Sequence, residues 1–244
     1  RNHTATHLLH QALKDICGEH VEQKGSLVAQ DYLRFDFSHH EGVTAEQIAT
    51  IEKMINEKII NNNAVETHLK NIDDARAMGA MALFGEKYDD EVRVVQIDDF
   101  SLELCGGTHV SRTGDIGTFK ITSEGSVSAG IRRIEAITGM DAVKANIANT
   151  AVLQGISLDL KCKVDAIPER LTKMAETTKS LQKELEEAKS KLVALEAGSY
   201  LEKAQEVGDI KLILETLECD ANALKDTAHT LRAKIGSGVI VLAS

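Results

Sequence analysis

The sequence predicts an α+β fold, with a mixed or antiparallel sheet and helices followed by long helices. In residues 1–139, short strand-like runs follow one another without regular helical crossovers, which favours α+β over a doubly wound sheet. Beyond Gly139 the chain becomes rich in Ala, Leu, Lys and Glu, with apolar residues three and four apart, as in a coiled coil. The end of the chain, from residue 207, reads as strand, helix and strand. We therefore expect segments at 1–139, 140–206 and 207–244.

Hydrophobic periodicity places the elements of the first segment. A helix is expected from His3 to Gly18, and a second from Thr44 to Asn62. Thr44 can cap the second helix, and Gln47 three residues later completes a capping-box pattern. Alternating apolar runs predict the strands, which are expected at 32–37, 65–69, 92–97, 101–104, 117–122 and 131–138.

The second segment reads as two helices. The first is expected over 141–160, and the second starts near Pro168, a residue suited to the first turn of a helix. Apolar or small residues mark a seam on the second helix, at Leu171, Met174, Thr178, Leu181, Leu185, Ala188, Leu192 and Leu195. The partner of this seam is either the first helix, folded back as an antiparallel hairpin, or another chain.

The last segment predicts a strand over 210–217, a helix over 220–235 and a strand over 239–242. This βαβ unit is too small to be stable alone, so we expect it to continue beyond Ser244. The chain also begins at Arg1 without methionine, inside an expected helix. Both features lead us to expect a fragment of a longer protein.

Composition limits the classes of function. The 244 residues are 43% hydrophobic, enough for at least one core, and no apolar run approaches the ~20 residues of a membrane span. Without a secretory signal either, we expect a cytoplasmic protein without a membrane partner. The net charge of −10 argues against a general nucleic-acid binder, although a local basic patch at Arg132 and Arg133 remains compatible with it. Strand alternation places those two arginines on opposite faces.

Two ligand pairs about a hundred residues apart predict a metal site. His3 and His7 stand four apart on a helix, so both imidazoles leave one face. Cys105 and His109 flank a Gly-Gly loop that follows an apolar strand. Imidazole and thiolate together favour zinc over magnesium or calcium. The other cysteines lack ligand-like neighbours and paired spacing, so a disulfide framework is not expected for Cys17, Cys162 and Cys219.

Five ordered motifs carry a resemblance to a known family. They are RNHTATHLLH at 1–10, VEQKGSLV at 21–28, LRFDFS at 33–38, LCGGTHV at 104–110 and GIRRIEA at 130–136. The first 140 residues resemble the editing half of bacterial-type alanyl-tRNA synthetase. The remainder is similar in architecture to the helical hairpin of that family and to the start of its C-terminal tRNA-binding and dimerising domain, which implies a possible homodimer of the parent protein. The family's aminoacylation domain has no counterpart here, so ATP-dependent alanine activation is implied only for the parent.

The resemblance implies hydrolysis of tRNA(Ala) mischarged with serine or glycine. An apolar alanine pocket admits glycine and rejects the extra hydroxyl of serine by only roughly a hundredfold, so a second site must remove both errors. The family's zinc ligands fall on His3, His7, Cys105 and His109, and its editing-pocket positions fall on Thr6 and Gln23. Thr6 is expected to gauge the aminoacyl side chain, and Gln23 to hold a water or a carbonyl.

Three further residues are expected to contact the substrate. Gly106 and Gly107 leave space for the acceptor end, and Arg132 is our choice for a phosphate contact. Whether the zinc is catalytic or structural stays open, because four protein ligands resemble a closed site and catalytic zinc keeps a position for water.

Other readings remain beside this one. A free-standing editing protein of the AlaX type shares the ligands but lacks the long helices and the final segment. A zinc-stapled dimerisation module would perform no chemistry. A zinc peptidase is disfavoured, because the helix reads His-Thr-Ala-Thr-His without a glutamate beside the first histidine.

Overall fold

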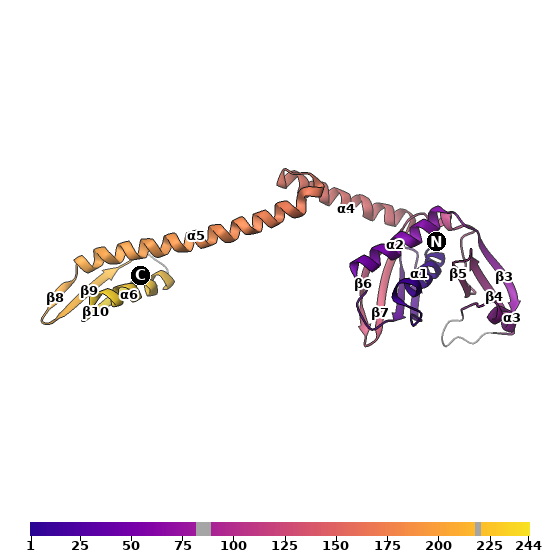
Figure 1. Cartoon of the computed structure of the whole chain (residues 1–244), viewed down its shortest axis with the longest axis horizontal. Helices are drawn as coiled ribbons and strands as arrows, with labels where there is room; N and C mark the ends of the chain where they lie inside the picture. Colours follow the sequence, from indigo (N-terminus) through magenta and orange to yellow (C-terminus); the bar gives the residue numbers. More distant parts are fainter. Residues whose placement is uncertain (82–88, 218–220) are drawn as a thin grey trace. The chain divides into compact units, whose positions relative to one another are not determined.

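The computed structural model describes residues 1–81, 89–217 and 221–244 and shows a mixed α+β fold, as predicted (Figure 1). Cys219 lies outside the described residues. The chain divides into two compact units, Arg1–Leu153 and Gln154–Ser244. The division falls inside one helix, α4 (Gly139–Leu160), which begins where the last strand of the first unit ends.

The main sheet of the first unit has four antiparallel strands in the order β1-β2-β7-β6. Sequence periodicity located three of them, and the structure gives β1 (Gln23–Val28), β2 (Leu33–Ser38), β6 (Phe119–Ser128) and β7 (Ile131–Thr138). Two helices pack with this sheet, α1 (Asn2–Cys17) and α2 (Ala45–Ile60). The capping box predicted for α2 is present, since Thr44 and Gln47 exchange hydrogen bonds between side chain and backbone.

The core of this unit forms where α1 and α2 meet the sheet. Its largest fully buried members include Phe35 and Phe37 of β2, Leu8 and Leu9 of α1, and Ile55 of α2. Ten residues of α1 are buried, so the helix presents little surface to solvent. The position of α1 is therefore fixed by packing over most of its length.

A second antiparallel sheet has the order β3-β4-β5. Its strands are β3 (Val65–Asn71), β4 (Glu91–Ile97) and β5 (Ser101–Leu104), with a short helix α3 (Ile72–Ala77) beside them. A small core under these strands includes Val92, Val94 and Leu104. Because β5 ends at Leu104, the cysteine of the predicted metal site follows directly on a strand that is anchored in a core.

Three elements of the first unit escaped the sequence analysis, namely β1, α3 and the 3-10 helix η1 (Thr113–Ile116). Strand β1 is an edge strand that is mostly exposed, so it lacks the apolar alternation that reveals a half-buried strand. Helix α3 has six residues, too few to show a helical period, and its start is set by the Asn71 side chain, which accepts a hydrogen bond from the backbone of Asp73.

The second unit contains the long helix α5 (Ile167–Glu202), preceded by the 3-10 helix η2 (Val164–Ala166), with Pro168 in its first turn. The leucines and Met174 of the predicted seam are between 46% and 75% exposed. The partner of this seam, either the helix over 141–160 or another chain, stays a prediction.

A three-stranded sheet follows α5, with the order β10-β9-β8 (Figure 1). Its elements are β8 (Gln205–Val207), β9 (Ile210–Thr216), α6 (Ala221–Ile235) and β10 (Gly238–Ala243). Strand β10 is parallel to β9, so the βαβ unit predicted from the sequence is present, and β8 adds an antiparallel edge that the sequence did not reveal. Within the described residues, none of the helices combines the length and apolar character that a membrane span requires.

The capping box of α2 leads to a test of stability. Thr44→Ala removes the side-chain acceptor for the backbone N–H of Gln47, so we expect a loss of about 1 kcal/mol in the free energy of unfolding, measured in urea. Thr50→Ala, in the exposed interior of the same helix, is the matched control and should be neutral or slightly stabilising. Equal effects of the two substitutions would contradict the capping role.

Candidate metal centre

Helix α1 supplies the first pair of candidate ligands. His3 and His7 both belong to the helix that begins at Asn2. Because they stand four residues apart, they lie one turn apart on the same face, with imidazole centres 5.4 Å apart. His7 is buried and His3 is half-buried. The apolar side chains of Leu8 and Leu9 anchor the helix in the core, so the two imidazoles are held rather than free to swing.

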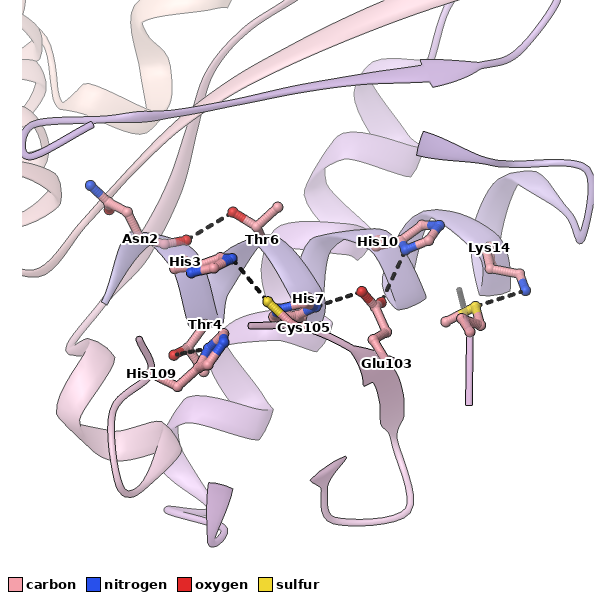
Figure 2. A network of polar contacts seen from close by, with 11 residues as sticks. Asn2, His3, Thr4, Thr6, His7, His10, Lys14, Glu103, Cys105 and His109 are labelled. Atoms are coloured by element: carbon pink, nitrogen blue, oxygen red, sulfur yellow. Dashed lines mark hydrogen bonds and ion pairs between the residues drawn. The ribbon is translucent and has the colours of Figure 1, made fainter. Parts of the chain in front are cut away.

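The loop after β5 supplies the second pair, Cys105 and His109. The Cys105 thiol lies 3.4 Å from Nε2 of His3. The ring of His109 lies 4.5 Å from that of His3 and 5.0 Å from that of His7, measured between centres. Figure 2 shows the three imidazoles gathered around the sulfur of Cys105. One ligand atom from each of the four residues lies within 4.8 Å of the others, so the structure brings the whole predicted set together.

Gly107 makes this approach possible. A β-carbon at Gly107 would clash with the imidazole of His3, whereas one at Gly106 would meet nothing within 4 Å. The imidazole of His3 therefore occupies the space beside Gly107. The sequence analysis had assigned this space to the acceptor end of the substrate. The space beside Gly106 is open.

A second layer of hydrogen bonds orients the ligands. Glu103 is buried and accepts hydrogen bonds from Nδ1 of His7, at 2.5 Å, and from Nδ1 of His10, at 3.0 Å. The Thr4 hydroxyl lies 3.3 Å from Nδ1 of His109 and also accepts from the backbone N–H of Val110. A ligand imidazole bound in this way through one nitrogen presents the other to a metal.

The unpartnered atoms test whether a metal fits. Nε2 of His7 and Nε2 of His109 are buried and have no hydrogen-bond partner within the described structure. Buried polar atoms normally have a partner, so these two nitrogens, facing the same thiol, indicate a site for a cation. Zinc bonds of about 2.0 to 2.3 Å place ligand atoms roughly 3.5 Å apart, which small side-chain rotations would achieve here. Three imidazoles and one thiolate are donors that zinc prefers.

The charges in the cluster favour the same conclusion. Burial opposes ionisation of the Cys105 thiol, but the interactions with His109, His3 and His7 outweigh it and bring its pKa to about 3. Burial opposes the charged form of His7 too, yet Cys105 and Glu103 raise its pKa to about 10. Glu103 remains anionic despite its burial, because His10 and His7 bring its pKa to about 2. The half-buried thiolate of Cys105 and the buried carboxylate of Glu103 therefore face protonated imidazoles, whose protons a divalent cation can replace.

Glu103 and its partner His10 were missed from the sequence. Spacing alone gives no ligand pattern for either residue. The sequence offered one signal, because Glu103 stands two residues before Cys105, and an extended chain that continues past Leu104 places residues two apart on the same side. An acid on the same side as a predicted thiolate ligand is a candidate for a residue that orients the neighbouring imidazoles.

The two predicted pocket residues lie on different elements. Thr6 is buried in α1, and its hydroxyl donates to the backbone carbonyl of Asn2 at 2.9 Å, so its oxygen is turned back along the helix. Gln23 opens β1, opposite Phe37 of β2, and is half-buried. The amide of Gln23 makes no hydrogen bond within the described part of the chain, which leaves it free for a water or a carbonyl.

Arg132 has a protein partner. Its guanidinium donates two hydrogen bonds of 2.7 Å to the carboxylate of Glu124, across the β6–β7 hairpin. Arg133 makes an equivalent pair with Asp36 on β2, at 2.7 and 2.8 Å. The two arginines do face opposite sides, as the alternation predicted. The bidentate pair with Glu124 uses Nε and one terminal nitrogen of Arg132, so a phosphate contact would fall to its remaining N–H groups, and that contact stays a prediction.

A cavity of about 330 Å³ lies beside His3. Its wall includes Asn2, whose side-chain amide donates to the carbonyls of Ala29 and Gln30 at 2.9 and 3.1 Å and accepts from the Thr138 hydroxyl at 2.6 Å. These bonds tie the start of α1 to the turn after β1 and to the end of β7. The cavity is therefore built by the same helix end that carries the first ligand.

Comparisons with known proteins identify the relatives of this chain. The family described as the threonyl and alanyl tRNA synthetase second additional domain matches residues 92–135, which include Cys105 and His109. The alanine–tRNA ligase of Pseudoalteromonas translucida is 49% identical over 243 residues, and that of Bacillus pumilus is 50% identical over 243 residues. In both cases the match covers 99% of this chain and 28% of the relative.

The resemblance to alanyl-tRNA synthetases is confirmed. The likeness to the alanyl-tRNA synthetases extends over both compact units, well beyond the 92–135 region. That region holds only half of the ligand set, and the other half, His3 and His7, lies in α1. The chain spans about a quarter of the length of the curated relatives it matches, 28% in each case given above.

The Gly-Gly loop generates a paired test of the metal centre. Gly107→Ala should displace the His3 ring and lower the affinity for zinc at least tenfold, measured by competition with a chromogenic chelator. Gly106→Ala is the matched control, because its β-carbon enters open space, and should bind zinc like the unchanged chain. Equal losses of zinc affinity in both variants would mean that the glycines are needed for the flexibility of the loop and not to make room for His3.

The buried carboxylate generates another test. Glu103→Gln keeps the shape of the side chain but removes the charge that His7 and His10 face, so zinc affinity should fall about 10- to 100-fold in the same competition assay. Glu91→Gln, at the exposed start of β4 in the same sheet, controls for the loss of a negative charge. An unchanged zinc affinity in Glu103→Gln would show that the carboxylate does not orient the ligands.

Proposed function

We propose that this chain is the editing part of an alanyl-tRNA synthetase, and that it hydrolyses the aminoacyl ester of tRNA(Ala) mischarged with serine or glycine. The observation that carries the proposal is the convergence of His3, His7, Cys105 and His109 beside a polar cavity, in a chain that matches alanine–tRNA ligases along nearly its whole length. For the whole protein we propose ATP-dependent attachment of alanine to tRNA(Ala), which residues 1–244 do not perform.

The donor chemistry supports zinc as the bound ion. His3, His7, Cys105 and His109 would hold it, with Glu103 and Thr4 fixing the orientation of His7 and His109. When bound, zinc supplies a Lewis acid that polarises an ester carbonyl or a water. Four protein ligands also suit a structural ion, so a zinc-stapled module without chemistry is the competing function.

The other residues of the site have positioning roles in this proposal. Gln23 holds the attacking water or the ester carbonyl with its unbonded amide, and Thr6 borders the aminoacyl side chain through its methyl group, since its hydroxyl bonds to the backbone of Asn2. The open face of Gly106 receives part of the acceptor end. Aminoacyl esters are intrinsically labile, so a fixed water and a fixed carbonyl can suffice without a strong side-chain base.

The exposed seam of α5 supports a further part of the proposal. Its leucines expose apolar surface in a row along one helix. A second copy of the helix can cover such a row in a coiled coil, so we propose that the parent protein dimerises through its C-terminal region. Dimerisation is independent of the hydrolysis, which needs residues of the first unit alone.

Release of serine from seryl-tRNA(Ala) by residues 1–244 loaded with zinc tests the proposal. The unchanged chain should release serine well above the spontaneous rate, and Cys105→Ala and Gln23→Ala should each lower kcat/KM by at least tenfold, because they remove a ligand and a positioning amide. Cys162→Ala, a free cysteine outside the first unit, is the matched control and should keep full activity.

The result for Gln23→Ala separates the two functions. If Gln23→Ala binds zinc, remains folded and releases serine at the rate of the unchanged chain, Gln23 has no part in the reaction. If the unchanged chain is folded and loaded with zinc but does not release serine above the spontaneous rate, the zinc-stapled module without chemistry is the better account. Circular dichroism and the zinc content of each variant provide the necessary controls.

A further inference from the structure

The pairing of β1 with β2 is irregular where Gln23 stands. Gln23 lies opposite Phe37, and the next paired residue of β1, Gly25, lies opposite Asp36. Over this step β1 therefore has one residue more than β2, which is a β-bulge. A regular register continued from Gly25 would set Lys24 opposite Phe37 and turn Gln23 to the other face of the sheet. The bulge is thus what brings Gln23 to the face on which Phe37 lies.

This face of the sheet is the one on which α1 packs. Phe37 belongs to the same buried core as Leu8 of α1. Residues directly opposite each other on antiparallel strands share a face, so Gln23 lies on the α1 side as well. Helix α1 carries His3 and His7 of the ligand cluster. The register at the bulge therefore decides whether the amide of Gln23 lies on the side of the metal centre.

Ser38 holds the residues that precede the bulge. Its backbone N–H donates to the carbonyl of Glu22 at 3.0 Å, and its hydroxyl accepts from the backbone N–H of Glu22 at 2.9 Å. The same hydroxyl donates to the carbonyl of His20 at 2.7 Å. These three hydrogen bonds tie residues 20–22 to the end of β2, so the chain enters β1 in one register.

Two imidazoles join the same segments. Nε2 of His20 and Nδ1 of His39 lie 2.9 Å apart, within hydrogen-bond distance, and the centres of the two rings lie 5.1 Å apart. His39 is held in two further ways. Its backbone N–H donates to the carbonyl of Gly130, and its ring stacks on that of Phe37, with centres 6.3 Å apart. The bond between the imidazoles therefore links His20, which is exposed, to a residue that β2 and the β6–β7 hairpin already fix.

We propose that His20 is a positioning residue for the release of serine, and that it acts through Gln23. Its hydrogen bond to His39 holds the bulge in the register that keeps the amide of Gln23 on the α1 side. The inference rests on the proposed function, in which Gln23 holds the attacking water or the ester carbonyl. Neither histidine contacts the substrate in this role.

The bond between the imidazoles depends on pH. It needs one N–H and one lone pair at the contact, so it survives the first proton and is lost when both rings are protonated. Burial and then the imidazole of His20 lower the pKa of His39, and His40 and Arg132 act in the same direction, against the charge of Glu41. The bond is therefore present above the ordinary pKa of 6.5 and is lost as the pH falls through the lowered pKa of His39.

The kcat of serine release from seryl-tRNA(Ala) by zinc-loaded residues 1–244 tests the role of His20. His20→Ala should lower kcat about 3- to 10-fold, the effect of losing one neutral hydrogen bond. In a Gln23→Ala background the same substitution should have no further effect, because the two residues act as a unit. His68→Ala is the matched control. It removes a partly exposed imidazole that is paired with Glu66 on β3, and it should keep the kcat of the unchanged chain.

A pair that does not titrate separates positioning from a general need for histidine. In His20→Gln/His39→Asn, the amides can occupy the positions of Nε2 and Nδ1 and keep the hydrogen bond. This double variant should keep the kcat of the unchanged chain at about pH 7.5, where both imidazoles can be neutral. The ratio of kcat, unchanged chain over double variant, should fall as the pH drops below 6.5. Titration of the metal ligands is common to both proteins and cancels in this ratio.

Three results would overturn the role of His20: an unchanged kcat in His20→Ala, a loss that adds in full to that of Gln23→Ala, or a kcat ratio that is independent of pH. A double variant as slow as His20→Ala would overturn it as well. In each case, release of serine by the unchanged chain leaves the proposed hydrolase in place. If the unchanged chain is folded and loaded with zinc but does not release serine, the hydrolase fails and this inference fails with it. Circular dichroism and zinc content verify the fold and the metal centre of every variant.

Discussion

The hydrogen bonds between the buried carboxylate of Glu103 and two imidazoles of α1 join the fold to the candidate site. A carboxylate removed from water is costly unless it is paired, so α1 must lie where His7 and His10 reach it. This requirement fixes the first helix of the chain against the end of β5. The same contact occupies Nδ1 of His7 and leaves Nε2 directed to the thiol of Cys105, so one interaction sets both the packing and the ligand geometry.

Local patterns predicted much of the architecture. The positions of α1, α2, β4, β5 and β7 followed from apolar periodicity, because each buries one face in a core. The four candidate ligands followed from two short spacings, and the structure brings them together. Strand β1 could not be predicted, because an exposed edge strand has no buried face to produce a pattern. The contact of Gly107 with the ring of His3 could not be predicted either, because it depends on a helix far away in the sequence.

The basic residues show where sequence reasoning stops. Arg132 and Arg133 stand out as adjacent positive charges, yet each has a carboxylate partner on a neighbouring strand. That pairing depends on the β6–β7 hairpin and on the register between β7 and β2, which composition does not give.

The separation of the two ligand pairs along the chain has a consequence for the order in which the site can form. In an unfolded chain each pair offers two donors, and bringing them together costs the entropy of closing a loop of about a hundred residues. In the folded chain the packing of α1 already holds the two pairs together. A cation that needs four donors therefore binds the native state more tightly than the unfolded state. Loss of the ion would therefore loosen the start of α1 first, where His3 and the cavity wall lie.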